Sequence, residues 1–341
     1  MTRNSRYDAA VVTPPTQTQP GDRVAGPVTT RPLLTVAASC CICGTRDAEP
    51  VGVGPDFEYR TSPDSFLAVR CTRCGVVYLD RRPDLSELNR IYPDHYHAFA
   101  FTEDRFGLVY SVRRRLEARR LLHAFRDLPS KARIVDVGCG DGFHLDLLSN
   151  FGLKGWSLEG VDIDDRAISA ARRRGLTVHR GRVEELDLPE GSFDAALMIQ
   201  TVEHLADPAA VLRAVYRMLV PGGRLLLVTD NTGSLDFTIA KRRHWGGYHF
   251  PRHWYLFNAP SLRRLAEQCG FTVATMGTMM SPVNWVYSAR NALDDWGASR
   301  EIVDRLSLES PVALAAGTAL DTLHQLVGRG ALLRAVLTRP R

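Results

Sequence analysis

Apolar runs and helix-like segments alternate through the middle of the chain. The first run, 134–137, reads Ile-Val-Asp-Val and is typical of a buried parallel strand. A segment with Leu145, Leu147 and Leu148 as its apolar positions follows, and we expect it to be helical. Further runs that we expect to be strands cover residues 158–164, 195–199, 225–229 and 270–274. This alternation predicts an α/β fold with a doubly wound, Rossmann-like sheet.

The turn after the first strand carries three glycines at alternate positions, Gly138, Gly140 and Gly142. A strand, a glycine turn and a helix build a nucleotide site in open α/β sheets, because glycine lets the backbone approach a ligand closely. Dinucleotide folds use G-x-G-x-x-G. Here the pattern is D-x-G-x-G-x-G, with Asp136 inside the strand end. The spacing therefore differs from that of a dinucleotide site.

On these residues the chain resembles the class I S-adenosylmethionine (SAM)-dependent methyltransferases. Gly-Val-Asp at 160–162 matches the end of that family's second strand. Gln-Thr-Val-Glu-His at 200–204 and Leu-Val-Pro-Gly-Gly-Arg at 219–224 are similar to its ubiquinone-type group. The resemblance implies a methyltransferase fold, a SAM cofactor and an enzyme that transfers a methyl group.

The same resemblance implies roles for the residues around the turn. Asp136 would orient the glycine loop, and Asp162 would accept hydrogen bonds from the ribose hydroxyls, whereas Asp164 would cap the next helix. Family members often carry an acid where Arg182 stands, so that the backbone of Val183 is left as the adenine contact. The expected cofactor-binding set is Asp136, Gly138, Cys139, Gly140, Gly142, Asp162, Ile163, Val183 and Gln200.

Two Cys-x-x-Cys-Gly segments predict a metal site. Cys40 with Cys43 and Cys71 with Cys74 supply four sulfurs, which satisfy a closed, structural zinc site. C-x-x-C spacing leaves Cys41 outside the set. The gap between the segments exceeds the usual length of about 15–20 residues, and we expect Phe57–Ser65 within it to form an additional hairpin. The alternative is two reduced thiol pairs without metal.

Length and composition suggest several parts in one chain. The 341 residues suffice for one large domain and one or two small ones. The start is rich in Pro, Thr and Gln, as in disordered tails, and we place no clear seventh strand near the end, where 281–296 and 306–338 look helical. The expected division is a disordered tail at 1–38, a zinc-ribbon-like domain and linker at 39–100, a methyltransferase domain at 101–280 and a C-terminal helical extension at 281–341.

Composition also limits location and partners. No apolar run approaches the roughly 18 residues of a membrane span, and no signal-peptide pattern opens the sequence, so we expect a cytoplasmic protein without a transmembrane segment. The net charge of +5 is modest and argues little for nucleic acid as a partner. The C-terminal helices are expected to pack on the core or on a second copy in a homodimer, with contact to a membrane surface as another hypothesis.

The junction after the cysteines contains Tyr92-Pro-Asp-x-Tyr96. It resembles bacterial methyltransferases that carry an N-terminal zinc ribbon, including some deoxysugar C-methyltransferases. Tyr92 and Tyr96 are candidates for covering the cofactor or substrate. Aromatic packing between ribbon and core is the other interpretation.

A loop rich in histidine and aromatic residues, 244–257, follows the 225–229 strand. Strand ends of this kind face the ligand side of an α/β sheet, and histidine can take a proton near neutral pH. His249 and His253 are the predicted bases, and His204 is a third candidate. Arg252 is predicted to hold a substrate carboxylate or phosphate, with Tyr248 as a further substrate contact. The alternative is that these groups are structural.

The predicted function is methyl transfer from SAM to a hydroxyl or amine of a small molecule or sugar. An RNA methyltransferase is one alternative, since zinc ribbons precede some of those enzymes as well. A non-catalytic module that binds SAM or zinc is another. The sequence decides neither the acceptor nor among O-, N- and C-methylation.

Overall fold

The computed structural model describes residues 31–93, 96 and 103–341. Most of the predicted disordered tail, 1–30, lies outside the described residues. The tail boundary at residue 38 was wrong, because Thr35–Ala37 forms strand β1 and pairs antiparallel with β5, Arg81–Pro83.

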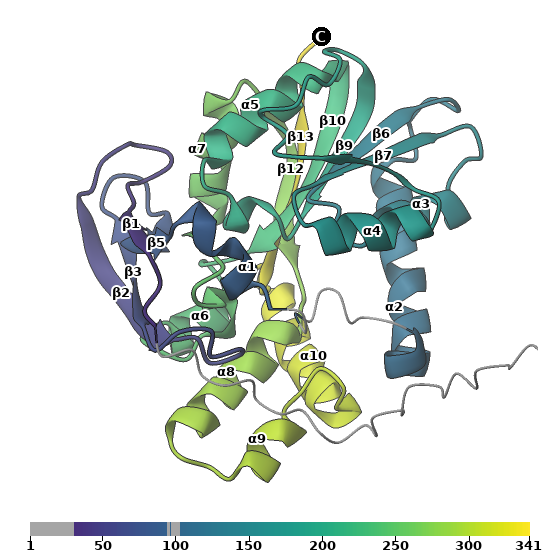
Figure 1. The fold of residues 1–341 in the computed structure, drawn as a ribbon. Coiled ribbons are helices and arrows are strands. Elements are labelled where there is room, and N and C mark those ends of the chain that lie inside the picture. Colours follow the sequence, from purple (N-terminus) through teal and green to yellow (C-terminus); the bar gives the residue numbers. More distant parts are fainter. Residues whose placement is uncertain (1–30, 94–95, 97–102) are drawn as a thin grey trace, which may run out of the picture.

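A seven-stranded mixed sheet forms the centre of the molecule (Figure 1). Its strands lie in the order β12-β13-β10-β9-β6-β7-β8, and the five from β10 to β8 are parallel. The predicted α/β sheet is therefore confirmed. The strands are β6 (Arg133–Val137), β7 (Ser157–Asp162), β8 (Thr177–Arg180), β9 (Phe193–Ile199), β10 (Leu219–Asp230), β12 (Thr272–Met279) and β13 (Leu332–Thr338).

Helices cover both faces of this sheet because successive strand residues point to opposite sides. On β6, Ile134 packs with α2 and α3, whereas Val135 belongs to the larger core that includes α5 and α7. Strands buried on both faces read as continuous apolar runs, which is why the sequence pattern located them. These helices are α2 (Glu103–Ala124), α3 (Phe143–Phe151), α5 (Pro208–Met218) and α7 (Ala259–Gln268), while α4 (Asp165–Arg173) contacts β7 and β8.

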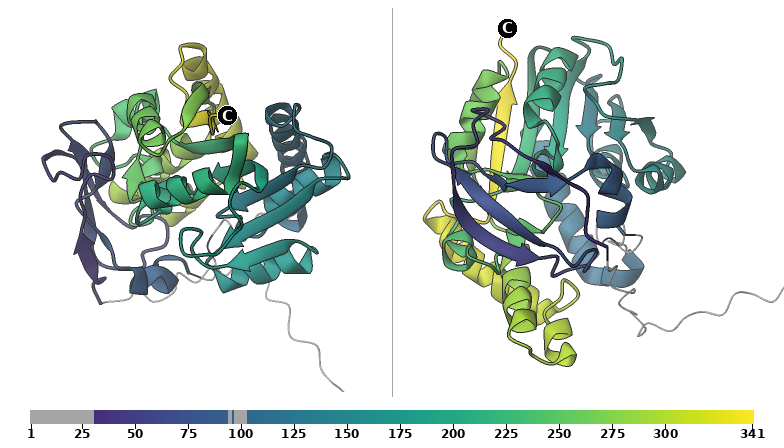
Figure 2. Two further views of the ribbon diagram at one scale, coloured as in Figure 1. Left: turned by 90° about the horizontal axis from the view of Figure 1, so that it is seen from above. Right: turned by 60° about the vertical axis from the view of Figure 1, so that its left-hand side comes forward.

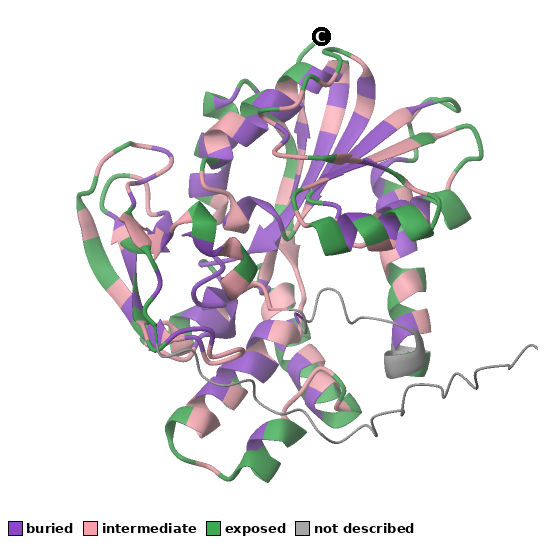
Figure 3. Cartoon of the chain, in the orientation of Figure 1, coloured by how far each residue is buried: buried purple, intermediate pink, exposed green. Residues whose placement is uncertain are grey.

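The C-terminal segment differs from the prediction of helices up to residue 338. After α10 (Pro311–Leu326), residues 328–330 break the helix, and β13 enters the sheet antiparallel to both β10 and β12. Leu333, Ala335 and Leu337 are buried there. The outer side of α10 is exposed, in contrast to the central strands (Figure 3). The predicted helix over 281–296 is confirmed as α8 (Val283–Asp295), and α9 spans Arg300–Arg305.

A second sheet lies beside the two cysteine segments, on the opposite side of the molecule from α2 (Figures 1 and 2). We call residues 31–83 the ribbon. The order of this sheet is β11-β4-β3-β2, with β2 (Ala48–Pro55), β3 (Ser65–Cys71), β4 (Val77–Leu79) and β11 (Tyr255–Leu256). Strand β11 comes from the histidine-rich loop, so the ribbon and the core share one sheet. The cysteine segments are separated by the hairpin β2–β3. The residues predicted to form an additional hairpin, 57–65, are instead the connection between these two strands.

Short helices complete the chain around this junction. They are η1 (Leu85–Glu87), α1 (Leu88–Ile91), η3 (Val202–His204), α6 (Leu235–Ala240) and η4 (Gly246–Tyr248). Within the described residues, no helix is long and apolar enough to cross a membrane.

The position of β13 between two strands gives a stability prediction. Leu337→Ala should lower the free energy of unfolding by about 2–5 kcal/mol, because a fully buried side chain is removed from the sheet core. Leu326→Ala is the matched control, since Leu326 on α10 is 78% exposed and should change stability by less than about 0.5 kcal/mol. Urea unfolding followed by circular dichroism measures both. Equal effects would contradict the placement of β13.

Candidate functional site

The glycine turn adopts the backbone that its sequence predicts. Gly138, Gly140 and Gly142 have φ of 75°, 54° and 81°, a region that favours glycine. A Cβ on Gly138 would lie 2.5 Å from the Thr201 side chain, so the turn packs directly on the end of β9. The amide of Gly138 donates to the carbonyl of Val161 at 2.8 Å, which fixes the turn to β7.

Asp136 is a buried carboxyl group below this turn. Its Oδ2 has no hydrogen-bond partner among the described residues. Burial, and then the charge of Asp162, raises its pKa to about 8. His144 lies 3.8 Å away, but burial and Arg113 lower the pKa of that imidazole to about 3, so it remains neutral. A ligand with cationic N–H donors, such as the α-ammonium group of SAM, fits this oxygen.

Asp162 is the last residue of β7, at the strand end where the sequence placed it. One of its oxygens accepts from the amide of Gly140 at 2.8 Å and the other from the amide of Asp164 at 2.9 Å. Burial raises its pKa. Asp164 is the N-cap of α4, which confirms that prediction. Since a carboxylate oxygen has a second acceptor site, Asp162 can still accept from ribose hydroxyls.

The other predicted cofactor residues lie near the same edge in different environments. Ile163, next to Asp162, is 51% exposed and offers an apolar surface to the adenine ring of the predicted cofactor. Gln200 donates to Asp230 at 3.3 Å. The side chains of Cys139 and Val183 are buried in apolar clusters, so only their backbones can face a ligand.

The four predicted metal ligands come together. The sulfurs of Cys40, Cys43, Cys71 and Cys74 all lie within 4.8 Å of one another, and Cys41 is not among them. Four sulfurs bound to one zinc ion at 2.3 Å would lie about 3.8 Å apart. The donor set and its compactness therefore fit tetrahedral zinc.

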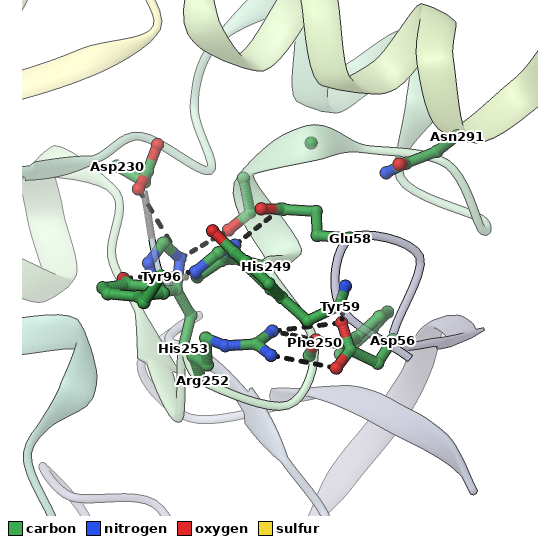
Figure 4. Close-up of polar contacts among 12 residues, drawn as sticks. Asp56, Glu58, Tyr59, Tyr96, Asp230, His249, Phe250, Arg252, His253 and Asn291 are labelled. Carbon is green, nitrogen blue, oxygen red and sulfur yellow. Dashed lines mark hydrogen bonds and ion pairs between the residues drawn. The ribbon is translucent and has the colours of Figure 1, made fainter. Parts of the chain in front are cut away.

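The histidine-rich loop contacts the residues that follow β9 and β10, because Trp254 donates to the carbonyl of Glu203 and Phe257 forms a β-bridge with Asn231. Figure 4 shows its His249 and His253 beside Glu58 and Asp230. His249 Nδ1 lies 2.6 Å from Glu58 Oε1, and its Nε2 lies 3.3 Å from the Tyr96 hydroxyl. Burial, followed by the charges of Arg252 and His204, lowers its pKa well below the usual value. His249 is therefore a neutral imidazole at neutral pH.

The other two candidate bases lie against His249. The His204 ring is 4.6 Å and the His249 ring 5.0 Å from the His253 ring, measured between centroids. His204 Nδ1 lies 2.8 Å from the Tyr92 hydroxyl. His253 Nδ1 donates to the carbonyl of Gly247 at 2.8 Å. The structure thus brings His204, His249, His253, Tyr92 and Tyr96 into one cluster.

Arg252 and Tyr248 do not have the geometry of substrate contacts. Arg252 is fully buried and forms two hydrogen bonds to Asp56, at 2.9 and 3.1 Å. Its Nε donates to the carbonyl of Ile91 at 2.6 Å. Tyr248 is 1% exposed and donates to the carbonyl of Lys241. Both predictions are corrected, because these groups tie the loop to the ribbon and the core.

Four acids near the cluster were not predicted. Asp56 and Glu58 come from the ribbon turn, where no local pattern marks them. Glu203 and Asp230 are buried at the ends of β9 and β10, and burial raises their pKa values to about 8 and about 7. One of the four could have been predicted from the sequence. Asp230 directly follows the apolar 225–229 run, in the same way that Asp162 ends the second predicted strand.

Comparisons with known proteins agree with this geometry. A family model described as "Methyltransferase domain" matches residues 110–276. The chain carries a class I SAM-dependent methyltransferase domain. The resemblance drawn from the glycine turn and the strand ends is thereby confirmed.

Several methyltransferases of known name are similar to this domain in sequence. Ubiquinone biosynthesis O-methyltransferase of Xanthomonas oryzae pv. oryzae is 34% identical over 116 residues, which are 32% of this chain and 47% of that protein. The enzyme of the same name from Hahella chejuensis is 32% identical over 165 residues, 46% of this chain and 66% of that protein. The chain spans about half the length of the first curated relatives it matches.

The solved structure of Haemonchus contortus phosphoethanolamine N-methyltransferase 2 in complex with SAM shares the fold. The TM-score is 0.52 at 16% identity, over 86% of this chain and 69% of that chain. At this identity the likeness concerns the fold of the methyltransferase domain.

The Arg252–Asp56 pair generates a stability prediction. Arg252→Met should destabilise the protein by about 3–5 kcal/mol at pH 7, because it leaves a buried carboxylate without its partner. Burial raises the pKa of Asp56, but Arg252 and the hydrogen bonds lower it to about 2. In the wild type the pair therefore stabilises above pH 3.8, and this stabilisation is lost as pH falls through about 2.

In the variant the opposing charge of Arg252 is gone and burial raises the pKa of Asp56, so the difference from wild type should already shrink as the pH falls from 7 to 4. Arg180→Met is the control, because its partner Asp165 and Arg180 itself are both largely exposed, and less than about 1 kcal/mol is expected. Thermal and urea unfolding at pH 7 and pH 4 measure the two variants. A pH-independent effect would contradict the ion-pair origin.

Proposed function

We propose that the protein transfers the methyl group of SAM to a hydroxyl or amine of a small molecule or sugar, with a histidine of the 204–253 cluster as the base. The observation that carries the proposal is the proximity of two features at one sheet edge. The glycine turn, with the Asp136 oxygen that has no hydrogen-bond partner, would hold the cofactor, and the histidine cluster lies at the end of β9. The named O-methyltransferases among the relatives support a small-molecule acceptor.

The segment 200–204 connects the two features. Thr201 packs on Gly138 of the turn. Two residues further on, the carbonyl of Glu203 accepts from the amide of Trp254 at 2.7 Å, and Nδ1 of the next residue, His204, lies 3.2 Å from the carbonyl of Arg252. The Tyr92 hydroxyl lies 2.8 Å from His204 Nδ1, and the Tyr92 carbonyl accepts at 3.0 Å from Arg166, four residues after Asp162. An acceptor held near Tyr92 would thus lie between cofactor and base.

The chemistry asks little more of the protein than positioning and proton removal. Bound SAM supplies an electrophilic methyl group. The acceptor's proton would pass to an imidazole nitrogen, and its oxygen or nitrogen would bond to the methyl carbon while the bond from that carbon to the sulfonium sulfur breaks, which leaves S-adenosylhomocysteine. His249 is neutral and can take this proton, and the tyrosines exclude water from the cluster.

For the ribbon we propose one structural zinc ion bound by the four cysteines. Gly44 and Gly75 follow the two C-x-x-C segments with positive φ and donate back to Cys40 and Cys71. These turns direct both sulfurs of each segment to one point, which is the arrangement that zinc requires.

SAM binding is the first test. Calorimetric titration should show binding by the wild-type protein and an affinity about 10–100-fold lower for Asp162→Ala, since charge-assisted hydrogen bonds are lost. Asp165→Ala is the control, because that side chain is 67% exposed. Labelled methyl transfer to a panel of hydroxyl and amine acceptors then tests the activity. Absence of SAM binding in the wild type would favour a non-catalytic module.

Zinc content tests the cysteine assignment. Mass spectrometry of the purified protein should find one zinc ion per chain, lost in Cys43→Ser and retained in Cys41→Ser, because only Cys43 belongs to the four-sulfur cluster. The zinc-free variant should also unfold at a lower temperature. Zinc retention in Cys43→Ser would refute the proposed site.

A further inference from the structure

Glu58 belongs to the ribbon but contacts the histidine cluster. It lies in the turn between β2 and β3, in the stretch that separates the two cysteine segments. Its Oε1 is 2.6 Å from His249 Nδ1, and the two side chains are only 7% and 6% exposed (Figure 4). This short, buried contact joins residues that are 191 positions apart in the sequence.

The ribbon turn is held at this place by its own acid. Asp56 accepts from the amides of Tyr59 and Thr61, each at 3.0 Å, which closes the turn around Glu58. The same carboxylate binds Arg252 of the histidine-rich loop. Glu58 and His249 are therefore each anchored through a neighbour two or three residues away, and their separation is fixed by the Asp56–Arg252 pair.

The contact decides which nitrogen of His249 is basic. A carboxylate only accepts hydrogen bonds, so Nδ1 carries the proton and donates to Glu58. Nε2 then has the lone pair, and the hydroxyl of Tyr96 lies 3.3 Å from it. His253 differs, because its Nδ1 donates to a neutral backbone carbonyl at 2.8 Å and lies 3.6 Å from Asp230 Oδ2. The carboxylate of Glu58, at 2.6 Å from His249 Nδ1, is the closer partner for an imidazolium.

We propose that the ribbon supplies Glu58 as a positioning residue that makes His249 the general base. Nε2 of His249 receives the acceptor's proton beside Tyr96, and the Glu58 carboxylate stabilises the imidazolium that results. The ribbon is in this way part of the active site and not a separate module. The inference rests on the proposed methyl transfer and specifies the base that the proposed function leaves open.

The surroundings of His249 determine how the pH profile should respond. The charged groups facing it are Glu58, Asp56 and Arg252. The other titratable groups are His204, His253, Tyr96 and Tyr59, whose rings contact one another or His249. Arg252 lowers the pKa of His249 more than Asp56 raises it, and Glu58, 2.6 Å from Nδ1, is the carboxylate in direct contact with the imidazole. Its removal should lower the pKa of His249.

The test compares Glu58→Gln with Glu49→Gln, a matched change at an exposed position of the same hairpin. For Glu58→Gln we expect kcat to fall about 100-fold, while zinc content and SAM affinity stay at wild-type values. The acid limb of its kcat–pH profile should move to lower pH, because a neutral amide no longer raises the pKa of the base. Glu49→Gln should behave as wild type. Turnover of Glu58→Gln within twofold of wild type would overturn the proposal.

A second measurement does not depend on an acceptor. Nitrogen-15 NMR of the histidine rings, with His249 assigned from His249→Asn, should show a protonated Nδ1 and an unprotonated Nε2 in the wild type. The opposite tautomer, or one unchanged in Glu58→Ala, would overturn the role of Glu58 even if the protein methylated nothing. Absence of methyl transfer by the wild type, with the expected tautomer, would instead refute the proposed function.

Discussion

The buried ion pair between Asp56 and Arg252 is the contact on which the arrangement of the site depends. Neither side chain is exposed to solvent. Removing two charges from water is costly, and a pair of this kind persists only where further hydrogen bonds satisfy both partners. Here Thr61, Tyr59, Ile91 and Phe250 supply them. Because the partners come from the ribbon and from the histidine-rich loop, the pair fixes these segments to each other.

The same contact explains why the ribbon and the methyltransferase domain form one structural unit. Strand β11 is part of the histidine-rich loop and pairs with β4. The other neighbour of β4 is β3, which ends at Cys71. Leu79 on β4 also donates to the carbonyl of Trp254. The sequence suggested a domain boundary near residue 100. The segments on its two sides are not structurally independent, because they share this sheet. A proposed zinc ion in the ribbon would stabilise the loop that carries the histidines.

Features that depend on a few neighbouring residues could be predicted from the sequence. The glycine turn, the acid at the end of β7 and the cysteine spacing each depend on a few neighbouring residues, and the structure places them as expected. Arg252 was misassigned because its partner Asp56 is 196 residues away, and no local pattern reveals such a pairing. Strand β13 was missed for a related reason. Its alternation of buried and half-buried residues is short, and it follows a helix with only a glycine break between them.

Buried carboxyl groups give the sheet edge its electrostatic character. Asp136, Glu203 and Asp230 lie at the ends of adjacent parallel strands, and burial raises the pKa of each to about 7 or 8. Near neutral pH they are partly protonated, so a cation that reaches them lowers their pKa values and is itself stabilised. SAM carries a sulfonium and an ammonium group, whereas S-adenosylhomocysteine retains only the ammonium. In the proposed reaction, an edge of this kind would favour the donor over the product, because the product lacks the sulfonium charge.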